Sequence, residues 1–202
     1  MALAGMRLWM QRHAPVLCAP GLCYGASDLS ADPAHTAEAA ARIAAALPAG
    51  VALWTSPRVR CTVLAEAVAR LRPDLGAVRT DVRLAEMDFG AWEGRPWSAI
   101  ARSEFDAWLA DFADARPGGH GESTRAFMQR VAAAWDDWRS GGRDAAWFTH
   151  AGVMRAAGLV ERGRRTVREA GDWPQDAIGH GEWLCLGGSH TDLRSIDKDR
   201  SG

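Results

Sequence analysis

Leu8-Trp9-Met10-Gln11-Arg12-His13-Ala14-Pro15 is an apolar run that leads directly into an arginine–histidine pair and then a proline. The apolar run predicts a buried strand from about Met6 to Arg12. Because Pro15 disfavours helical backbone for the residue before it, the chain must stay extended or turn, and His13 is left at the carboxyl end of the strand. In open α/β sheets, ligands bind at that end of the strands.

The chemistry of the pair suggests what such a ligand would be. A neutral imidazole is a nucleophile near pH 7, and a guanidinium binds phosphate through two hydrogen bonds. Arg12 and His13 are therefore a candidate phosphoryl acceptor beside an anion-binding group. A histidine that only hydrogen-bonds a neighbouring loop would have the same local sequence, so the rest of the chain must supply further site residues.

Length and composition exclude several classes of protein. A chain of 202 residues fits one domain, or a core with a modest inserted cap. The 24 Lys and Arg against 25 Asp and Glu leave a formal charge of −1, which is not the charge pattern of a general nucleic-acid or membrane-binding protein. Since no apolar run reaches about 18 residues, we expect no membrane span.

The cysteines bear on metal binding and on the compartment. The four cysteines form no C-x-x-C pair and no zinc-like spacing, and no secretory leader precedes them, so we expect a cytoplasmic protein. Cys61 and Cys185 lie in apolar patterns and are interpreted as small buried residues. The sequence predicts no metal site.

Strand and helix patterns alternate along the chain, which predicts an α/β fold. After the first strand, the pattern predicts a helix over Pro33–Leu47 and a strand over Val51–Trp54. A second helix is predicted from Pro57 to about Leu71, with Ser56 as its cap, and a short strand near Ala77–Arg79. Near the end of the chain, the pattern predicts a strand over Ala145–Thr149, a helix through Val160 and a last strand over Trp183–Leu186. The tail beyond Gly187 is expected to fray.

Two later segments offer partners for His13. Arg58 and Arg60 fall in the first turn of their helix, where a cation opposes the helix dipole, so a bound anion would compensate for it; a solvated arginine explains the pattern equally well. His150 directly follows the strand over Ala145–Thr149 and precedes small residues and a new helix, which repeats the pattern of the first strand.

The middle of the chain departs from the alternation. Residues 83–94 contain Glu86 together with two glycines and packed aromatics, which indicates a fixed loop. Helical patterns follow from Pro96 to Phe112, a glycine-rich break covers Pro117–Gly121, and Glu122-Ser123 opens a long helix to about Arg139. The segment at about 92–121 is therefore predicted to be a helical cap insertion.

Taken together, these segments resemble the histidine phosphatase superfamily, which has the phosphoglycerate-mutase-like fold. The resemblance covers most of the chain in the right order and is carried by Arg12-His13, Ser56-Pro57-Arg58-Val59-Arg60, Leu84-Ala85-Glu86 through Trp92-Glu93-Gly94, and Thr149-His150-Ala151-Gly152. The loop Cys23–Asp28 and the turn Gly121-Glu122-Ser123 are most similar to those of α-ribazole phosphatases, which act in cobalamin nucleotide-loop assembly. Ala14 replaces the glycine usual after the Arg-His pair, and the longer chain of the mutases is not apparent.

The resemblance implies a three-layer α/β/α sandwich with a mostly parallel central sheet and a small helical cap, formed by residues 1–202 as a single domain. It also implies that the reaction needs no metal and no cofactor. His13 would be the nucleophile, and water would hydrolyse the resulting phosphohistidine; Arg12, Arg60 and His150 would surround the phosphoryl oxygens. Glu86 would protonate the leaving alkoxide and later activate water. The implied catalytic set is His13, Glu86, His150, Arg12 and Arg60, and the implied substrate-binding set is Arg12, Arg60, Tyr24, Ser27 and Ala151.

Several alternatives stay open at this stage. The leading substrate is α-ribazole 5′-phosphate, and the alternatives are a broad-specificity sugar or nucleotide phosphatase, a phosphoglycerate mutase, and a protein that binds a phosphorylated ligand without catalysis. In each case the partner is a small molecule. The cap residues set specificity in a way that spacing does not encode. Most of the ten tryptophans should pack in the core or the cap, and one or two near the pocket would stack on a planar substrate.

The remaining histidines are assigned to the surface or left without a role. His35, His120 and His190 are predicted to be exposed. His180 lies in a late loop that family members bring toward the pocket, and we do not assign it to the site.

Overall fold

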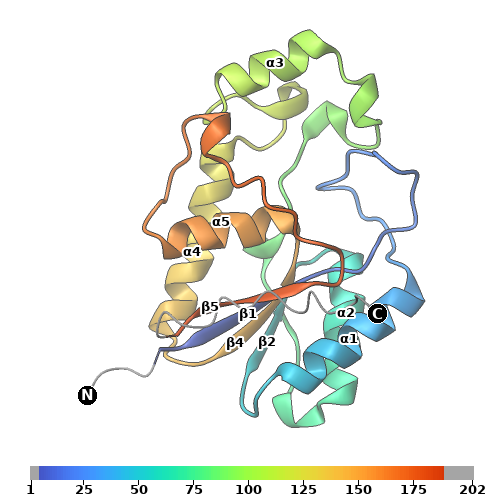
Figure 1. Ribbon diagram of the computed structural model, residues 1–202, viewed down its shortest axis with the longest axis vertical. Helices are drawn as coiled ribbons and strands as arrows, with labels where there is room; N and C mark the ends of the chain where they lie inside the picture. Colours follow the sequence, from blue (N-terminus) through green and yellow to red (C-terminus); the bar gives the residue numbers. More distant parts are fainter. Residues whose placement is uncertain (1–4, 189–202) are drawn as a thin grey trace, which may run out of the picture.

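Five strands form one mixed sheet in the computed structural model, which describes residues 5–188 (Figure 1). The order across the sheet is β3-β2-β4-β1-β5; β5 is antiparallel to β1, and the other neighbours are parallel. The mostly parallel sheet predicted from the sequence is therefore confirmed. The strands are β1 (Arg7–Arg12), β2 (Ala52–Thr55), β3 (Arg79–Thr80), β4 (Ala145–Thr149) and β5 (Trp183–Gly187).

Helices cover both faces of this sheet. Helices α1 (Pro33–Ala46) and α2 (Val59–Leu71) pack on one face, and α4 (Thr124–Ser140) and α5 (Ala151–Glu161) pack on the other (Figure 1). Side chains of β1 alternate between the two cores: Trp9 joins the α1/α2 side, whereas Leu8 and Met10 join the α4/α5 side. A strand buried on both faces must be apolar throughout, which is why the opening run is so hydrophobic.

The register of the central strands brings three chain segments to one edge. Arg12 of β1 is paired with Thr149 of β4, and the His13 N–H donates to the Thr149 carbonyl at 3.1 Å. On the other side of β4, the Ser56 N–H donates to the Phe148 carbonyl at 2.9 Å. His13, His150 and Ser56 therefore leave adjacent strands at the same carboxyl edge.

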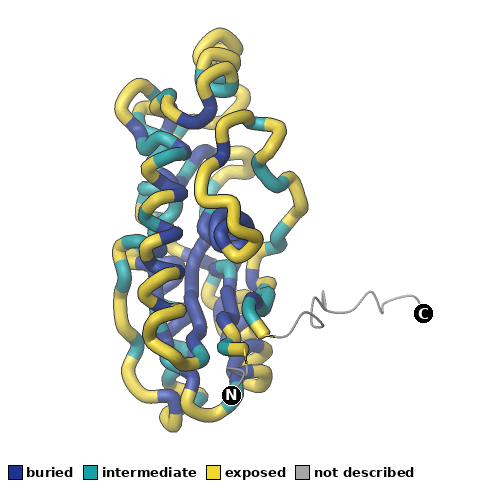
Figure 2. Tube along the Cα trace, turned by 90° about the vertical axis from the view of Figure 1, so that its left-hand side faces the viewer, coloured by how far each residue is buried: buried dark blue, intermediate teal, exposed yellow. Residues whose placement is uncertain are grey.

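The segment between β3 and α4 is built differently from the rest. It contains the short helix α3 (Arg102–Ala110) and the 3-10 turns η2 (Val82–Leu84), η3 (Gly90–Trp92), η4 (Trp97–Ala99) and η5 (Pro117–Gly119). Helix α3 lies at the end of the molecule farthest from the sheet, and none of its residues is fully buried, whereas the central strands are buried almost throughout (Figures 1 and 2). The remaining 3-10 turns are η1 (Pro73–Leu75) and η6 (Ala170–Asp172).

The start of α2 differs from the sequence-based prediction. The helix begins at Val59 rather than Pro57, and the residue at its cap position, Arg58, makes no side-chain capping bond. The Ser56 hydroxyl instead lies 2.8 Å from Nε2 of His150, although it also accepts the Arg58 N–H at 3.3 Å. Asp28 accepts the Val59 N–H at 2.7 Å, so the anion at this helix N-terminus belongs to the protein itself.

The predictions for the cysteines and for the histidines outside the motifs are confirmed in part. Cys61 is fully buried as expected, but Cys185 is only half-buried because it lies on the edge strand β5. His35 and His120 are exposed, and His190 lies outside the described residues together with the tail beyond Gly188. Among the described helices, none combines the length and the apolar character needed to cross a membrane.

Candidate active site

The imidazole of His13 is held in one orientation at the end of β1. The side chain is 2% exposed, and its Nδ1 lies 2.8 Å from the Ala14 carbonyl oxygen. Because a carbonyl can only accept, Nδ1 carries the hydrogen, and the neutral ring keeps its lone pair on Nε2. Burial lowers the pKa of His13 well below 6.5; Arg60 and Arg12 lower it further, although the Ala14 bond acts in the opposite direction. At pH 7 the ring is therefore a neutral nucleophile.

His150 faces His13 from the neighbouring strand. It is 1% exposed, its ring centroid lies 5.2 Å from that of His13, and its backbone forms the N-cap of α5. The Ser56 hydroxyl at 2.8 Å fixes the orientation of the ring. Burial, followed by the positive charge of Arg60, lowers the pKa of His150 well below 6.5, so this ring is neutral as well.

Arg60 comes from the first turn of α2 and is completely buried. Its two terminal nitrogens donate to the carbonyls of Ser27 at 2.6 Å and Gly25 at 2.7 Å, and its guanidinium carbon lies 5.3 Å from the centre of the Tyr24 ring. Of the two arginines in the motif, Arg60 lines the cavity described below and Arg58 does not.

Glu93 holds the loop that receives Arg60. Its carboxylate accepts the N–H groups of Gly25 and Ala26 at 2.9 Å and of Ser27 at 3.0 Å, together with the Ser27 hydroxyl at 2.5 Å. Burial alone would raise the pKa of Glu93, but these hydrogen bonds lower it overall. Because its hydroxyl is bonded to Glu93, Ser27 does not line the cavity. The sequence carried a signal for Glu93 only in the Trp92-Glu93-Gly94 motif, to which we gave no separate role.

Arg12 and His180 form a second group beside His13. Arg12 donates to the Ile178 carbonyl and, at 2.8 Å, to Nε2 of His180. The His180 ring centroid lies 5.4 Å from that of His13, and its Nε2 lies 3.3 Å from the Tyr24 hydroxyl. Sequence reasoning left His180 without a role, because no pattern in its loop indicates which neighbours the loop will meet.

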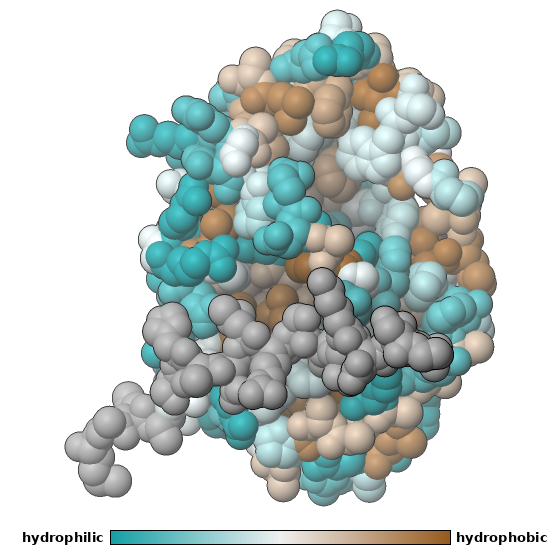
Figure 3. Space-filling view, viewed as in Figure 1, coloured by the Kyte–Doolittle hydropathy of each residue, from teal (hydrophilic) through white to brown (hydrophobic). Residues whose placement is uncertain are grey.

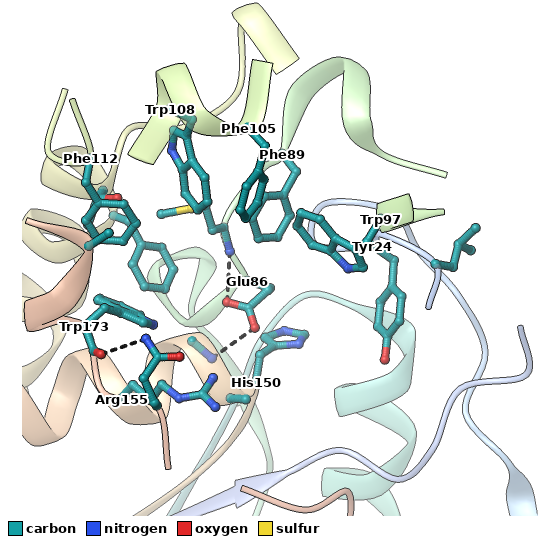
Figure 4. A pocket seen from close by; sticks show the side chains of 18 of the residues that line it. Tyr24, Glu86, Phe89, Trp97, Phe105, Trp108, Phe112, His150, Arg155 and Trp173 are labelled. Atoms are coloured by element: carbon teal, nitrogen blue, oxygen red, sulfur yellow. Dashed lines mark hydrogen bonds between the residues drawn. The ribbon is translucent and has the colours of Figure 1, made fainter. Parts of the chain in front are cut away.

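Glu86 reaches the same place from the loop after η2. One carboxylate oxygen accepts the Gly152 N–H at 3.1 Å, in the first turn of α5, and the other accepts the Met87 N–H at 3.1 Å (Figure 4). The approach is so close that a Cβ at position 152 would lie 2.2 Å from Glu86 Oε1, which is why a glycine stands there.

The loop that carries Glu86 is itself held by Arg130 of α4. This guanidinium donates to the carbonyls of Arg83 and Ala85 at 2.7 Å and to that of Glu86 at 3.1 Å. Glu122 holds the guanidinium in turn through two bonds of 2.7 Å. Neither Arg130 nor its carboxylate partner was predicted to act on the site.

One cavity of about 740 Å³ lies at this edge of the sheet. At one end lie Arg12, His13, Arg60, Glu86 and His150, the polar cluster, with Tyr24, Ala151 and Arg155 beside it. The rest of the lining includes the aromatic wall, which consists of Phe89, Trp97, Phe105, Trp108, Phe112, Phe127 and Trp173. In Figure 4, Phe89, Phe105 and Trp108 lie across the cavity from His150, whereas Trp173 lies beside Arg155. In the space-filling view, the surface is hollowed below the α3 region and apolar side chains border the hollow (Figure 3).

The cavity therefore combines a nucleophile, positive charge and a carboxyl group. The five predicted catalytic residues meet in it, as do Tyr24 and Ala151. The buried guanidinium of Arg60 and the partly buried guanidinium of Arg12, beside a neutral imidazole, suit a phosphoryl group, whose oxygens they would surround. Within residues 5–188, no three His, Cys, Asp or Glu side chains come together in a way that could hold a metal ion.

Comparisons with known proteins agree with this geometry. The model of the histidine phosphatase superfamily (branch 1) matches residues 8–159. A mycobacterial glucosyl-3-phosphoglycerate phosphatase has a similar structure, with a TM-score of 0.75, 22% identity and 91% of each chain covered. A Thermus thermophilus protein, TTHB049, is 29% identical with a TM-score of 0.66, and the match covers 90% of this chain and 93% of that one. A search of curated proteins found no match.

Proposed function

The chain belongs to the histidine phosphatase superfamily and is a phosphoric monoester hydrolase, and from this premise we propose that it removes the 5′-phosphate of α-ribazole 5′-phosphate through a phosphohistidine on His13. The observation that carries the mechanism is the bond between His13 Nδ1 and the Ala14 carbonyl. It leaves the Nε2 lone pair for the cavity that Arg12, Arg60 and Glu86 also line.

In the first step, Nε2 of His13 attacks phosphorus. The N–P bond forms while the bond from phosphorus to the 5′ oxygen breaks, and Glu86 gives its proton to that oxygen. Arg12, Arg60 and His150 surround the phosphoryl oxygens and stabilise the charge that spreads over them. Glu86 must enter this step as the neutral acid in order to give this proton.

In the second step, a water molecule attacks the phosphohistidine. Glu86, now a carboxylate, takes a proton from this water as its oxygen bonds to phosphorus and the N–P bond breaks. Inorganic phosphate leaves, and His13 returns to its neutral form with Nδ1 still bonded to Ala14. Protons and electrons balance over the two steps, and no cofactor is consumed.

The aromatic wall supports a substrate with a planar apolar group. Its rings meet in close pairs, with centroids 5.2 Å apart for Phe89 and Trp97 and 5.1 Å apart for Trp108 and Phe112. A benzimidazole base would fill this space and stack on the rings, whereas a small sugar phosphate would leave the wall in contact with water. We assign this selectivity to the cap at about 92–121, which supplies most of the wall.

Arg155 suits the part of the substrate between phosphate and base. It lines the cavity from α5 and donates one hydrogen bond to the Asp176 carbonyl at 2.9 Å. Within residues 5–188 it forms no ion pair, so its other N–H groups can donate to ribose hydroxyls.

The test is kcat/KM for α-ribazole 5′-phosphate beside glucose 6-phosphate, AMP, 3-phosphoglycerate and glucosyl-3-phosphoglycerate, all measured with a chelator present. We expect a preference of at least about 100-fold for α-ribazole 5′-phosphate, since burying a planar base contributes about 3 kcal/mol. A flat profile, or a preference for glucosyl-3-phosphoglycerate, would refute the substrate assignment while leaving the phosphohistidine to be tested separately.

A further inference from the structure

His180 stands outside the residues to which the family resemblance gives a role, yet it adjoins the polar cluster. Its ring centroid lies 5.4 Å from that of His13, and the ring centroid of His150 lies at a similar distance of 5.2 Å from that of His13.

The loop that carries His180 is attached to the main chain of the nucleophile. The Gly181 N–H donates to the His13 carbonyl at 3.0 Å, and the Arg12 N–H donates to the Glu182 carbonyl at 2.9 Å. Gly181 has a φ of +70°, a conformation that a side chain would strain. Arg42 donates to the Gly181 carbonyl at 2.9 Å. The position of His180 is therefore set by the backbone of β1 and not by a free loop.

The hydrogen bond to Arg12 defines the state of the His180 ring. A guanidinium can only donate, so Nε2 of His180 is an acceptor and carries no hydrogen. The Tyr24 hydroxyl, 3.3 Å away, is directed at the same nitrogen. Burial and the nearby Arg12 lower the pKa of His180 to about 4, which keeps the acceptor available at neutral pH.

Two of the five N–H groups of Arg12 are engaged by this loop, one by Nε2 of His180 and one by the Ile178 carbonyl. Both acceptors belong to the same short segment of chain, so together they fix the plane of the guanidinium. The Tyr24 hydroxyl also contacts this guanidinium, and the N–H groups that these partners leave are available to an anion. Without these acceptors, the side chain would have to lose rotamer freedom when phosphate binds.

We propose that His180 is a positioning residue that orients Arg12, and with it Tyr24, toward the phosphoryl group bound at His13. This role rests on the proposed phosphohistidine site, but not on the identity of the alcohol that the phosphate esterifies. It is a property of this loop and was not implied by the motifs that carry the family resemblance.

The test compares His180→Gln, His180→Asn and His180→Leu by kcat/KM for p-nitrophenyl phosphate and by the Kd of inorganic phosphate from calorimetry. The amide oxygen of glutamine reaches about as far as Nε2, whereas that of asparagine reaches only as far as Nδ1. We expect His180→Leu and His180→Asn to weaken both quantities about tenfold, and His180→Gln to restore most of the loss. His120→Leu, on another exposed loop, is the matched control and should change neither quantity.

A double-mutant cycle separates this role from a general effect on the loop. If His180 acts through Arg12, adding His180→Leu to Arg12→Ala should weaken phosphate binding no further. Additive losses, wild-type behaviour of His180→Leu, or equal losses in the glutamine and leucine variants would each overturn the proposal. A wrong substrate assignment would leave these measurements unchanged, and a wrong nucleophile would show as turnover surviving in His13→Ala while phosphate binding still reports on His180.

Discussion

The polar cluster and the aromatic wall border the same cavity but are built in opposite ways. His13, Arg60 and His150 are at most 2% exposed, and each has a hydrogen-bond partner that fixes its orientation. Trp97 of the aromatic wall is 38% exposed, and α3, which carries two other wall residues, has no fully buried residue. Four of the five polar residues stand at strand ends or at a helix N-terminus, and Glu86 stands on the loop after η2. Of the wall, Trp97 stands on η4, Phe105 and Trp108 stand on α3, and only Phe127 stands on one of the long helices.

This difference shows how the fold separates chemistry from specificity. Phosphoryl transfer needs charges and a lone pair held within tenths of an ångström, and buried groups with several hydrogen bonds provide that. Recognition of an apolar group needs area and shape, which rings can supply with few directional contacts. We therefore expect substitutions in the polar cluster to alter kcat for every substrate, and substitutions in the wall to alter kcat/KM for some substrates only.

The largest effect should come from His13→Ala. Removal of His13 should lower kcat at least about a thousandfold for all phosphomonoesters, because the phosphohistidine can no longer form and Nε2 of the neighbouring imidazole, His150, is engaged with the Ser56 hydroxyl. Inorganic phosphate should still bind, since Arg12 and Arg60 remain. Turnover within tenfold of the wild-type value would contradict the mechanism, and trapping of a ³²P-labelled protein in the wild type alone would confirm it.

Glu86→Gln should separate proton donation from phosphate binding within the polar cluster. Loss of the proton donor should slow hydrolysis of an alkyl phosphate by about 100-fold or more. The effect on the first step with p-nitrophenyl phosphate should be under tenfold, because this leaving group departs without a proton. The measurement is single-turnover kinetics with both substrates, and equal slowing of the two would remove Glu86 from the role of general acid.

Trp108→Ala should affect the wall and leave the polar cluster unchanged. The loss of ring contact with a planar base should lower kcat/KM for α-ribazole 5′-phosphate about tenfold or more. The same variant should bind inorganic phosphate with a wild-type Kd. If instead all substrates were slowed equally, the wall would be part of the catalytic apparatus and the separation described above would fail.

The last prediction concerns the pH dependence of stability and not turnover. The pKa values of His13 and His150 lie well below 6.5 in the folded state, so between the folded and unfolded values the unfolded chain binds protons that the folded chain does not. Stability should therefore fall as the pH is lowered from 7 to 5, by at most about 1.4 kcal/mol per pH unit for each histidine.

Urea unfolding at pH 7, 6 and 5 measures this dependence. His13→Asn should show a shallower loss than the wild type, because one buried imidazole is gone. His120→Asn, at an exposed position, is the control variant. Parallel curves for His13→Asn and the wild type would show that His13 does not titrate as its burial implies.

Much of the fold and of the polar cluster followed from short stretches of sequence. The apolar run before Arg12-His13 and the one before His150 predicted two buried strands, and their shared edge follows from parallel pairing. The prediction for Ser56 was wrong because its hydroxyl has a partner 94 positions away, at His150, which competes with the helix cap. The residues near Ser56 in the sequence do not indicate that its hydroxyl has a second partner in His150.

The contacts that orient the site were mostly absent from the sequence-based predictions. Glu93 accepts N–H groups from a loop 66 to 68 positions earlier, and Arg130 donates to carbonyls 44 to 47 positions earlier. His180 meets Arg12 across 168 positions. Each bond depends on where two separate segments lie in space, and either residue alone would be interpreted as a solvated surface group.

The alternation of strands and helices, a histidine at a strand end and the residue types around it could all be predicted from the sequence. These features depend on backbone preferences and apolar periodicity, which act over a few residues. Only the tertiary structure shows which nitrogen of His13 faces the cavity and which loops Glu93 and Arg130 hold. It also shows that seven aromatic side chains line one cavity. Those features depend on hydrogen bonds and packing between distant segments, and these interactions exist only once the chain has folded.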